Sequence, residues 1–299
     1  MNLYQETKFI MNKYGISANK SLGQNFLIDE EVVNSIVASA NISEDDLVIE
    51  IGPGLGTLTA KLLEKSKKVI CVELDTRMIR ILKERFLVYS NLEIINEDIL
   101  KVNLSDIIQK EKAENNIKNV KIVANLPYYI TTPIIMKLLE DNLDIESITV
   151  MIQKEVADRL CATPSSKLSG AITYTVYYYS EAEKIIQVPN NSFIPEPEVT
   201  SEVIKLVKRK EAPVEVNNPD FMFKVIKASF MQRRKTLANG LINGNILKTK
   251  QEVNEMLDSL GIPQNIRGEA LTLEQFAQIA NYLDMCHIGD RSQSANLAE

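Results

Sequence analysis

Four short apolar runs in the first half of the chain each lead into a glycine or a polar residue. They are residues 47–51 before Gly52, 68–73 ending at Glu73, 92–98 ending at Asp98, and 120–125 ending at Asn125. Helix-like segments separate the runs, and this alternation indicates a parallel, doubly wound α/β sheet that continues through residues 148–152. Ligands bind such a sheet beyond the carboxyl ends of its strands, so we expect the four terminal residues to share one binding edge.

A glycine-rich turn follows the first run. Glycines at Gly52, Gly54 and Gly56 let the backbone turn sharply and approach a ligand. Their Gly-x-Gly-x-Gly spacing differs from the Gly-x-Gly-x-x-Gly of dinucleotide binders, and Pro53 removes an N–H that a pyrophosphate would need. Tight packing alone is the alternative. Glu73 favours a ligand site over tight packing, because an acid about 20 residues past the glycines can bind two ribose hydroxyls. A single acid such as this is, however, commonly a helix cap.

The fourth run ends at the tetrapeptide Asn125-Leu126-Pro127-Tyr128. This tetrapeptide offers an amide oxygen, a proline-stiffened turn whose carbonyls can face a pocket, and a flat ring. These groups can hold an exocyclic amino group and stack on its base. Alone, an Asn and a Pro at a strand end indicate only a turn. The neighbouring motifs make the base-binding interpretation the better one.

Together, these motifs resemble the class I S-adenosylmethionine-dependent methyltransferases, and among them the ribosomal RNA adenine N6-dimethyltransferases that modify the small subunit. The resemblance covers nearly the whole chain. It rests on residues 20–27, the glycine turn, residues 125–128, 192–201, 230–237 and 267–272. It implies a Rossmann-like methyltransferase sheet with a smaller all-helical C-terminal domain.

The resemblance implies S-adenosyl-L-methionine as the cofactor, and it assigns residues to each part of that molecule. Asn25 and Leu27, with Gln24 beside them, are expected along the methionine side. Gly52 and Gly54 allow close backbone approach, Glu73 binds the ribose, and Asp98 contacts the adenine amino group. The expected cofactor site is therefore Gln24, Asn25, Leu27, Gly52, Gly54, Glu73, Asp98 and Asn125.

The expected reaction is methyl transfer to adenine N6. This nitrogen is a poor nucleophile because its lone pair is delocalised into the ring, and hydrogen-bond acceptors can orient that lone pair toward the methyl group. The resemblance gives this role to the Asn125 side-chain oxygen and the Leu126 carbonyl, within the turn made by Pro127. Tyr128 is expected to stack on the base, and Phe193 is expected either on the opposite face of the base or in the core. No metal is expected.

Charge is distributed unevenly along this acidic chain, whose net charge is −6. Residues 201–250 hold eleven Lys and Arg against four Asp and Glu, which indicates a local site for a polyanion. Arg233, Arg234 and Lys235 lie within an apolar pattern that predicts one helix over 220–241. We expect these three to contact RNA phosphates, with a solvated helix face as the alternative.

The expected domains are a catalytic domain at 1–210, whose residues 1–30 cover the cofactor and RNA, and a helical RNA-binding domain at 219–285. Residues 286–299 are expected to form a frayed tail. Residues 172–179, rich in tyrosine, and 202–207 read as an antiparallel pair of strands closing the sheet. Three scattered cysteines indicate neither disulfides nor a zinc site, and no apolar run approaches a membrane span. We expect a cytoplasmic monomer.

The resemblance implies dimethylation of two adjacent adenosines in a hairpin loop near the 3′ end of 16S rRNA, within an immature small ribosomal subunit. One alternative is a 23S rRNA adenine N6-methyltransferase of the macrolide-resistance type, which shares most of these motifs. The C-terminal motifs Arg233–Leu237 and Arg267-x-Glu269-x-Leu271 favour the small-subunit enzymes. A non-catalytic ribosome assembly factor is the second alternative, although the chain retains the Asn and glycines that catalysis needs.

Overall fold

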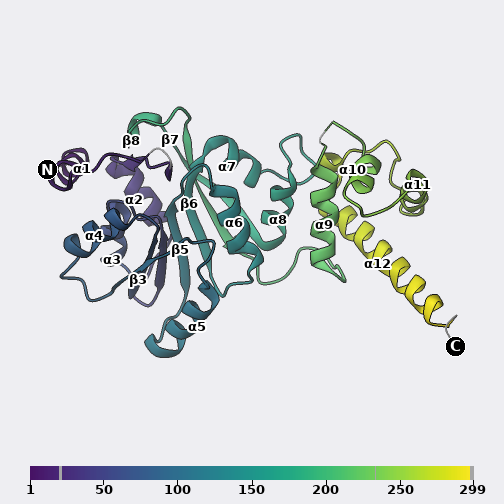
Figure 1. Ribbon diagram of the computed structural model, residues 1–299, viewed down its shortest axis with the longest axis horizontal. Helices are drawn as coiled ribbons and strands as arrows, with labels where there is room; N and C mark the ends of the chain where they lie inside the picture. The colour runs from purple at the N-terminus through teal and green to yellow at the C-terminus, as the bar shows by residue number, and fades with distance from the viewer. Residues whose placement is uncertain (20–21, 233, 297–299) are drawn as a thin grey trace. The chain divides into compact units, whose positions relative to one another are not determined.

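The computed structural model describes residues 1–19, 22–232 and 234–296, and the chain forms two compact units (Figure 1). Unit 1 comprises Met1–Asp158 and Ser180–Lys208, and unit 2 comprises Arg159–Tyr179 and Arg209–Glu299. Residues 159–179 thus belong with the C-terminal helices, although the sequence placed them with the sheet.

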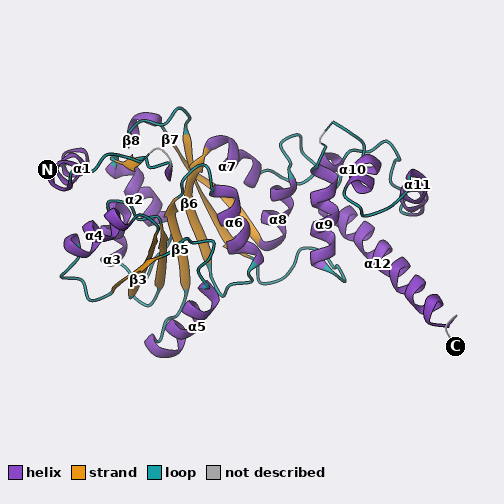
Figure 2. Ribbon diagram, in the orientation of Figure 1, coloured by secondary structure: helices purple, strands orange, loops and turns teal. Residues whose placement is uncertain are grey.

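A seven-stranded sheet organises unit 1, with the strand order β4-β3-β2-β5-β6-β9-β7 (Figure 2). Its strands are β2 (Leu47–Ile51), β3 (Lys68–Glu73), β4 (Leu92–Asn96), β5 (Val120–Asn125), β6 (Ser147–Gln153), β7 (Ser180–Val188) and β9 (Ser201–Lys208). The first five are parallel, and β9 and β7 are antiparallel. This arrangement confirms the predicted α/β fold.

Helices alternate with the strands of the sheet. They are α1 (Leu3–Tyr14), α2 (Glu30–Ser39), α3 (Thr57–Leu63), α4 (Thr76–Arg85), α5 (Leu104–Asn115), α6 (Thr131–Glu140) and α7 (Lys154–Leu160). Every residue of β2 is buried, as expected for a parallel strand covered on both faces.

Strand register brings the predicted site residues to one edge. Ile51 pairs with Val72 on one side and with Ala124 on the other, so the glycine turn begins between Glu73 and Asn125. After β2 the chain adds β3 and β4 on one side of this strand and then β5 and β6 on the other side. An open α/β sheet forms its binding crevice at such a reversal of strand order.

A separate two-stranded ribbon fastens the N-terminal segment. Strand β1 (Phe26–Leu27) pairs antiparallel with β8 (Phe193–Ile194). The Ile28 N–H donates to the Ser192 carbonyl over 2.9 Å, which extends the pairing by one bond. Residues 22–27 are therefore held beside the carboxyl edge of the sheet.

Unit 2 is helical in its described residues (Figure 2). Its helices are α8 (Ala171–Tyr179), α9 (Pro219–Phe230), α10 (Leu237–Asn243), α11 (Lys250–Ser259) and α12 (Leu273–Asn296). Tyr174 lies at the centre of the core, where its hydroxyl donates to the Leu271 carbonyl over 2.6 Å and its ring meets Phe276 edge-on.

The prediction of a strand over residues 172–179 is wrong, because this segment is helix α8. Its Thr, Val and Tyr residues have the composition of a strand. The helix instead brings Tyr174 and Tyr178, four residues apart, into the core of unit 2. The strand that pairs with β9 is β7, the next segment along the chain, whereas the predicted strand at 202–207 is confirmed as β9.

The single helix predicted over 220–241 is also wrong, because the chain breaks between α9 and α10. Thr236 is extended, and the Leu237 N–H donates to the Ile266 carbonyl over 2.8 Å, outside its own helix. A Cβ at Gly240 would lie 2.9 Å from the Ala228 carbonyl oxygen, so the two helices pack closely. The apolar pattern identified the buried residues but not the turn between them.

The predicted tail differs from the structure as well, because α12 continues to Asn296. Among the described residues, none of the helices has both the length and the apolar character to cross a membrane.

Candidate active site

A pocket opens at the carboxyl ends of β2, β3, β4 and β5. Five segments line it, and they are residues 22–27, 50–55 with 57–58, 72–74, 97–99, and 125–130 with 134. The structure brings to its wall these predicted residues: Gln24, Asn25, Leu27, Gly52, Gly54, Glu73, Asp98, Asn125, Leu126, Pro127 and Tyr128.

The glycines of the turn have two different structural roles. Gly52 has φ +66°, and a Cβ added there would meet no atom within 4 Å, so the space above it is open to a ligand. Gly56 has φ +85°, and a Cβ there would lie 2.5 Å from the Phe86 ring. The first glycine therefore serves the pocket, and the last allows α3 to approach α4.

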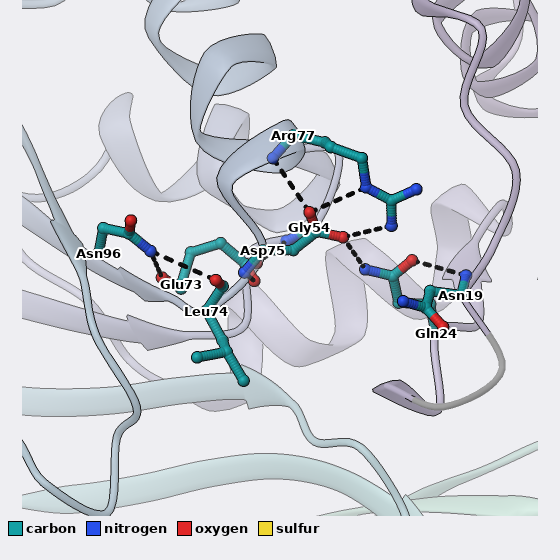
Figure 3. A network of polar contacts seen from close by, with 8 residues as sticks. All are labelled: Asn19, Gln24, Gly54, Glu73, Leu74, Asp75, Arg77 and Asn96. Atoms are coloured by element: carbon teal, nitrogen blue, oxygen red, sulfur yellow. Dashed lines mark hydrogen bonds and ion pairs between the residues drawn. The ribbon is translucent and has the colours of Figure 1, made fainter.

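The Glu73 carboxylate is held in one orientation at the pocket wall (Figure 3). One oxygen accepts the Gly54 N–H over 3.2 Å, and the other accepts the Asp75 N–H over 2.8 Å. Burial is the main cause that raises its pKa, against these two stabilising bonds. Each oxygen keeps a further lone pair, so this carboxylate can accept hydrogen bonds from a vicinal diol.

Gln24 connects the N-terminal segment to the sheet (Figure 3). Its amide nitrogen donates to Asp75 over 3.0 Å, and its amide oxygen accepts the Asn19 N–H over 2.9 Å. Arg77 forms an ion pair with Asp75 at 2.6 Å and is the main cause that lowers the Asp75 pKa. Sequence reasoning assigned no role to Asp75 and Arg77, although Asp75 follows Glu73 closely and caps α4.

The Asn125 amide is oriented by the same N-terminal segment. Its Nδ2 atom donates to the Asn25 main-chain carbonyl over 3.2 Å. Because the nitrogen is engaged there, Oδ1 is the atom that can accept a hydrogen bond from a ligand amino group.

The turn after Asn125 presents an aromatic ring in a fixed position. The Tyr128 hydroxyl bonds Ser201 Oγ over 2.5 Å, and burial raises the pKa of the phenol. The Pro127 carbonyl accepts from the Ile130 N–H and the Thr131 hydroxyl, which stiffens the turn. Sequence reasoning missed Tyr129, which also lines the pocket. Its side chain is 58% exposed, and a Cβ at Gly23 of the N-terminal segment would lie 3.2 Å from its ring.

Phe193 lies apart from these residues. Its side chain is 1% exposed and packs in the hydrophobic core of the sheet, behind Leu27, with which it is paired in the ribbon. The structure therefore places Phe193 in the second of its two expected positions, the core.

Comparison with known proteins identifies the family. The family model described as ribosomal RNA adenine dimethylase matches residues 15–285. The chain belongs to the ribosomal RNA adenine dimethylase family. A ribosomal RNA small subunit methyltransferase A from Lachnoclostridium phytofermentans is 50% identical over 94% of this chain and 96% of its own length. A protein of the same name from Geobacillus sp. is 47% identical over 93% of this chain and 95% of its own.

Solved structures of dimethylases and related enzymes share the fold. A dimethyladenosine transferase from Plasmodium falciparum has a TM-score of 0.72 and 27% identity, covering 87% of this chain and 98% of its own. The 23S rRNA methyltransferase ErmE has a TM-score of 0.63 and 25% identity, covering 87% of this chain and 100% of its own. The predicted resemblance is confirmed.

A dimethylase is a methyltransferase. Membership of the dimethylase family therefore implies that this chain uses a methyl donor of the S-adenosylmethionine type. The pocket of this dimethylase fits such a donor on two structural grounds. The open space over Gly52 admits a ligand against the backbone, and the oriented Glu73 carboxylate suits a ribose.

Glu50 of the dimethylase also lines the pocket, and sequence reasoning missed it. It is 1% exposed in the middle of β2, where it accepts from Thr59 Oγ1 over 2.6 Å and from Cys71 Sγ over 3.4 Å. Burial raises its pKa to about 7. A lone acid inside the apolar run 47–51 was the available signal, because burying a carboxyl costs free energy unless specific partners satisfy it.

The predicted RNA-binding residues of the dimethylase lie in unit 2. Arg234 and Lys235 are exposed in the turn between α9 and α10, whereas Arg233 lies outside the described residues. A turn displays basic side chains to a polyanion as well as a helix does, so the break in the predicted helix leaves this hypothesis intact.

Proposed function

We propose that this dimethylase transfers methyl groups from S-adenosyl-L-methionine to N6 of two adjacent adenosines, giving N6,N6-dimethyladenosine. The proposed target is a hairpin loop near the 3′ end of 16S rRNA in an immature small ribosomal subunit. The observation that carries the proposal is that Asn125 lines the pocket with its Nδ2 bonded to the Asn25 carbonyl, which leaves Oδ1 as the atom that can accept from a ligand amino group. The names of the two relatives support the small subunit as substrate.

The proposed cofactor site uses the wall between the glycine turn and β4. Glu73 accepts the two ribose hydroxyls, and Asp98, half-buried at the pocket wall, contacts the adenine amino group. Gln24, Asn25 and Leu27 close the methionine side, and Gly52 and Gly54 allow the backbone to lie against it. When bound, the cofactor supplies a methyl group made electrophilic by the positive sulfonium.

Asn125 and Leu126 orient the target nitrogen in our proposal. The Asn125 Oδ1 atom and the Leu126 carbonyl accept hydrogen bonds from the N6 amino group, which directs its lone pair toward the methyl. Tyr128 stacks on the base, with its ring held by Ser201. Positioning and electrostatics of this kind account for the catalysis, and the N6 proton leaves to water after transfer.

RNA reaches this site from a loop, where a base is unstacked at low cost. We propose that the basic turn of unit 2, including Arg234 and Lys235, contacts phosphates, and that the dimethylase acts as a monomer. The 23S rRNA enzymes are the second candidate, since ErmE shares the fold at 25% identity. The 47–50% identity to small-subunit enzymes favours the first.

Methyl transfer from labelled S-adenosylmethionine tests the proposal, with unmodified small subunits, large subunits and free 23S rRNA in parallel. We expect label in 16S rRNA alone. Label in 23S rRNA would overturn the substrate assignment, and no label in any RNA, with cofactor binding intact, would favour a non-catalytic assembly factor.

A further inference from the structure

A second hollow lies in unit 2, between α9 and the segment that joins α10 to α11. We call it the α9 groove and define it by its lining residues: Phe221, Lys224, Lys227, Ala228, Met231, Ile242, Gly244, Asn245, Ile246, Leu247 and Lys248.

One wall of the α9 groove is a single helix face. Phe221, Lys224, Lys227 and Met231 recur at intervals of three or four residues, so their side chains lie along one side of α9. Both lysines are exposed, and Met231 is 63% exposed at the end of this face. The wall therefore presents two cations above an apolar base.

The opposite wall is held firmly in place. A Cβ at Gly244 would overlap Ala228 of α9, so the backbone of this wall lies directly on the helix. The Gly244 N–H donates to the Gly240 carbonyl over 2.9 Å, and the Ile246 N–H donates to the Leu241 carbonyl over 2.9 Å. The α9 groove is thus preformed, and an occupant would bind without a large ordering cost.

The floor of the α9 groove is apolar and incompletely covered. Phe221, Ile242, Ile246 and Leu247 are each half-buried and pack at the edge of the unit 2 core. Exposed apolar surface rimmed by polar residues marks a binding site more often than free surface. A flat, apolar group of an occupant can bury itself there.

Charge at the α9 groove has one sign. Its described lining includes three lysines and no acidic residue. The first acid of the adjoining helix, Glu252, accepts the Lys248 and Thr249 N–H groups over 2.9 Å and 3.2 Å and so caps α11. A bare phosphate would not need the apolar floor, and a neutral apolar ligand would not need the lysines.

We propose that the α9 groove binds a single-stranded segment of RNA, with one unstacked base on the apolar floor and the flanking phosphates on Lys224 and Lys248. The choice of RNA as the polyanion rests on the proposed function. Aromatic and apolar platforms flanked by cations are the common means of holding single-stranded nucleic acid. Met231, at the end of the groove wall, is followed along the chain by the turn with the exposed Arg234 and Lys235, which would extend the same phosphate path.

Binding of fluorescent 12-nucleotide oligouridine to the full-length chain, followed by anisotropy over a series of KCl concentrations, tests the proposal. The test variant carries Lys224→Gln and Lys248→Gln. Its control carries Lys210→Gln and Lys250→Gln, which remove the same charge from exposed positions of unit 2 outside the groove. For the test variant we expect roughly tenfold weaker binding and a salt slope reduced by about 1.4, which is about 0.7 for each lost phosphate contact. The control should stay within about twofold of the wild type, a smaller change than one lost phosphate contact produces.

An abasic phosphodiester and a polyglutamate peptide serve as further probes, which distinguish single-stranded RNA from other polyanions as the occupant of the α9 groove. An abasic phosphodiester of the same length should bind the wild type several-fold more weakly than oligouridine, and equal binding would overturn the role of the floor. Equal salt slopes for the test and control variants would overturn the role of the lysines. A polyglutamate peptide that binds the groove in preference to oligouridine would reassign it to an acidic protein.

Methyl transfer to small subunits, measured on the same preparations, keeps this inference separate from the proposed function. Transfer by the wild type without a difference in RNA binding between the variants would overturn the groove alone. A binding difference without any transfer would overturn the proposed function and leave the groove standing.

Discussion

The side-chain amide of Asn125 donates to the main-chain carbonyl of Asn25 over 3.2 Å, joining two residues 100 positions apart in the chain. Asn125 ends the strand that carries the proposed base-binding turn, and Asn25 belongs to the segment that covers the proposed cofactor site. One hydrogen bond therefore connects the two halves of the pocket. A shift of the N-terminal segment would rotate the very oxygen that we propose to orient the adenine nitrogen.

Gln24→Ala should weaken cofactor binding by roughly three- to tenfold, because a lost hydrogen bond to a charged partner is worth about 1 kcal/mol or more. The change removes the Gln24 bonds to Asp75 and Asn19, so the N-terminal segment loses one of its attachments to the sheet. Isothermal calorimetry with S-adenosylmethionine measures the effect. Gln109→Ala, on the exposed face of α5, is the matched control. Equal affinities of the two variants would contradict the role given to Gln24.

Gly52→Ala and Gly56→Ala should fail in different ways. At Gly52 a Cβ meets no protein atom, so the protein should lose only about 1–2 kcal/mol of stability to backbone strain while cofactor affinity falls sharply. At Gly56 the Cβ collides with Phe86, so stability should fall by roughly 3 kcal/mol or more. Urea unfolding and calorimetry on both variants separate the effects. Intact cofactor binding by Gly52→Ala would show that the open space is not used.

Glu50→Gln should change the pH dependence of stability. In the unfolded chain Glu50 ionises near its ordinary pKa of 4.5, whereas burial holds the folded carboxyl protonated up to about 7. Stability from this group is thus fully present below about pH 4.5 and is lost as the pH rises through about 7. The glutamine side chain does not titrate, so the Glu50→Gln variant does not lose stability in this way as the pH rises.

The stability of Glu50→Gln relative to the wild type should therefore rise by on the order of 3 kcal/mol between pH 4.5 and pH 8. Urea unfolding of both proteins at pH 4.5, 6 and 8 measures the difference. A constant difference across the three pH values would mean that folding does not raise the pKa of Glu50 above its ordinary value.

Tyr128→Phe and Tyr128→Ala should separate the ring from its hydroxyl. Phenylalanine keeps the ring and loses only the bond to Ser201, so transfer should fall by less than about tenfold. Alanine removes the proposed stacking surface, which is worth about 1–3 kcal/mol, so transfer should fall by roughly tenfold to a hundredfold or more. Single-turnover methyl transfer to small subunits compares them. Equal losses would assign the role of Tyr128 to its hydroxyl.

The sequence predicted the sheet and its binding edge well because those features have strong local signals. Parallel strands buried on both faces read as continuous apolar runs, and β2 and β5 are of this kind. Since the carboxyl ends of such strands coincide, their terminal residues Glu73 and Asn125 were placed correctly at one pocket. This inference needs only strand order and register.

Errors arose where tertiary packing outweighed local preference. Helix α8 is rich in the β-branched and aromatic residues of strands, but burial of Tyr174 and Tyr178 in one core fixes it as a helix. The break between α9 and α10 depends on Leu237 bonding to Ile266, a partner nearly 30 residues away. Asp75 and Arg77 were missed for the same reason, because the bond from Gln24 to Asp75 and the ion pair of Asp75 with Arg77 exist only in the folded chain. Tyr129 was missed because only folding brings its ring beside Gly23.

Asn125→Ala tests the central claim most directly, through single-turnover methyl transfer to unmodified small subunits at saturating cofactor, with nucleoside analysis of the product. The wild type should form N6,N6-dimethyladenosine in 16S rRNA. The variant should lose transfer by roughly a hundredfold or more, as when one oriented polar group is removed from an active site. Its affinity for S-adenosylmethionine should remain within about tenfold, or about 1.4 kcal/mol, of the wild-type value. Dimethyladenosine formed by the variant at the wild-type rate would contradict the assignment of Asn125.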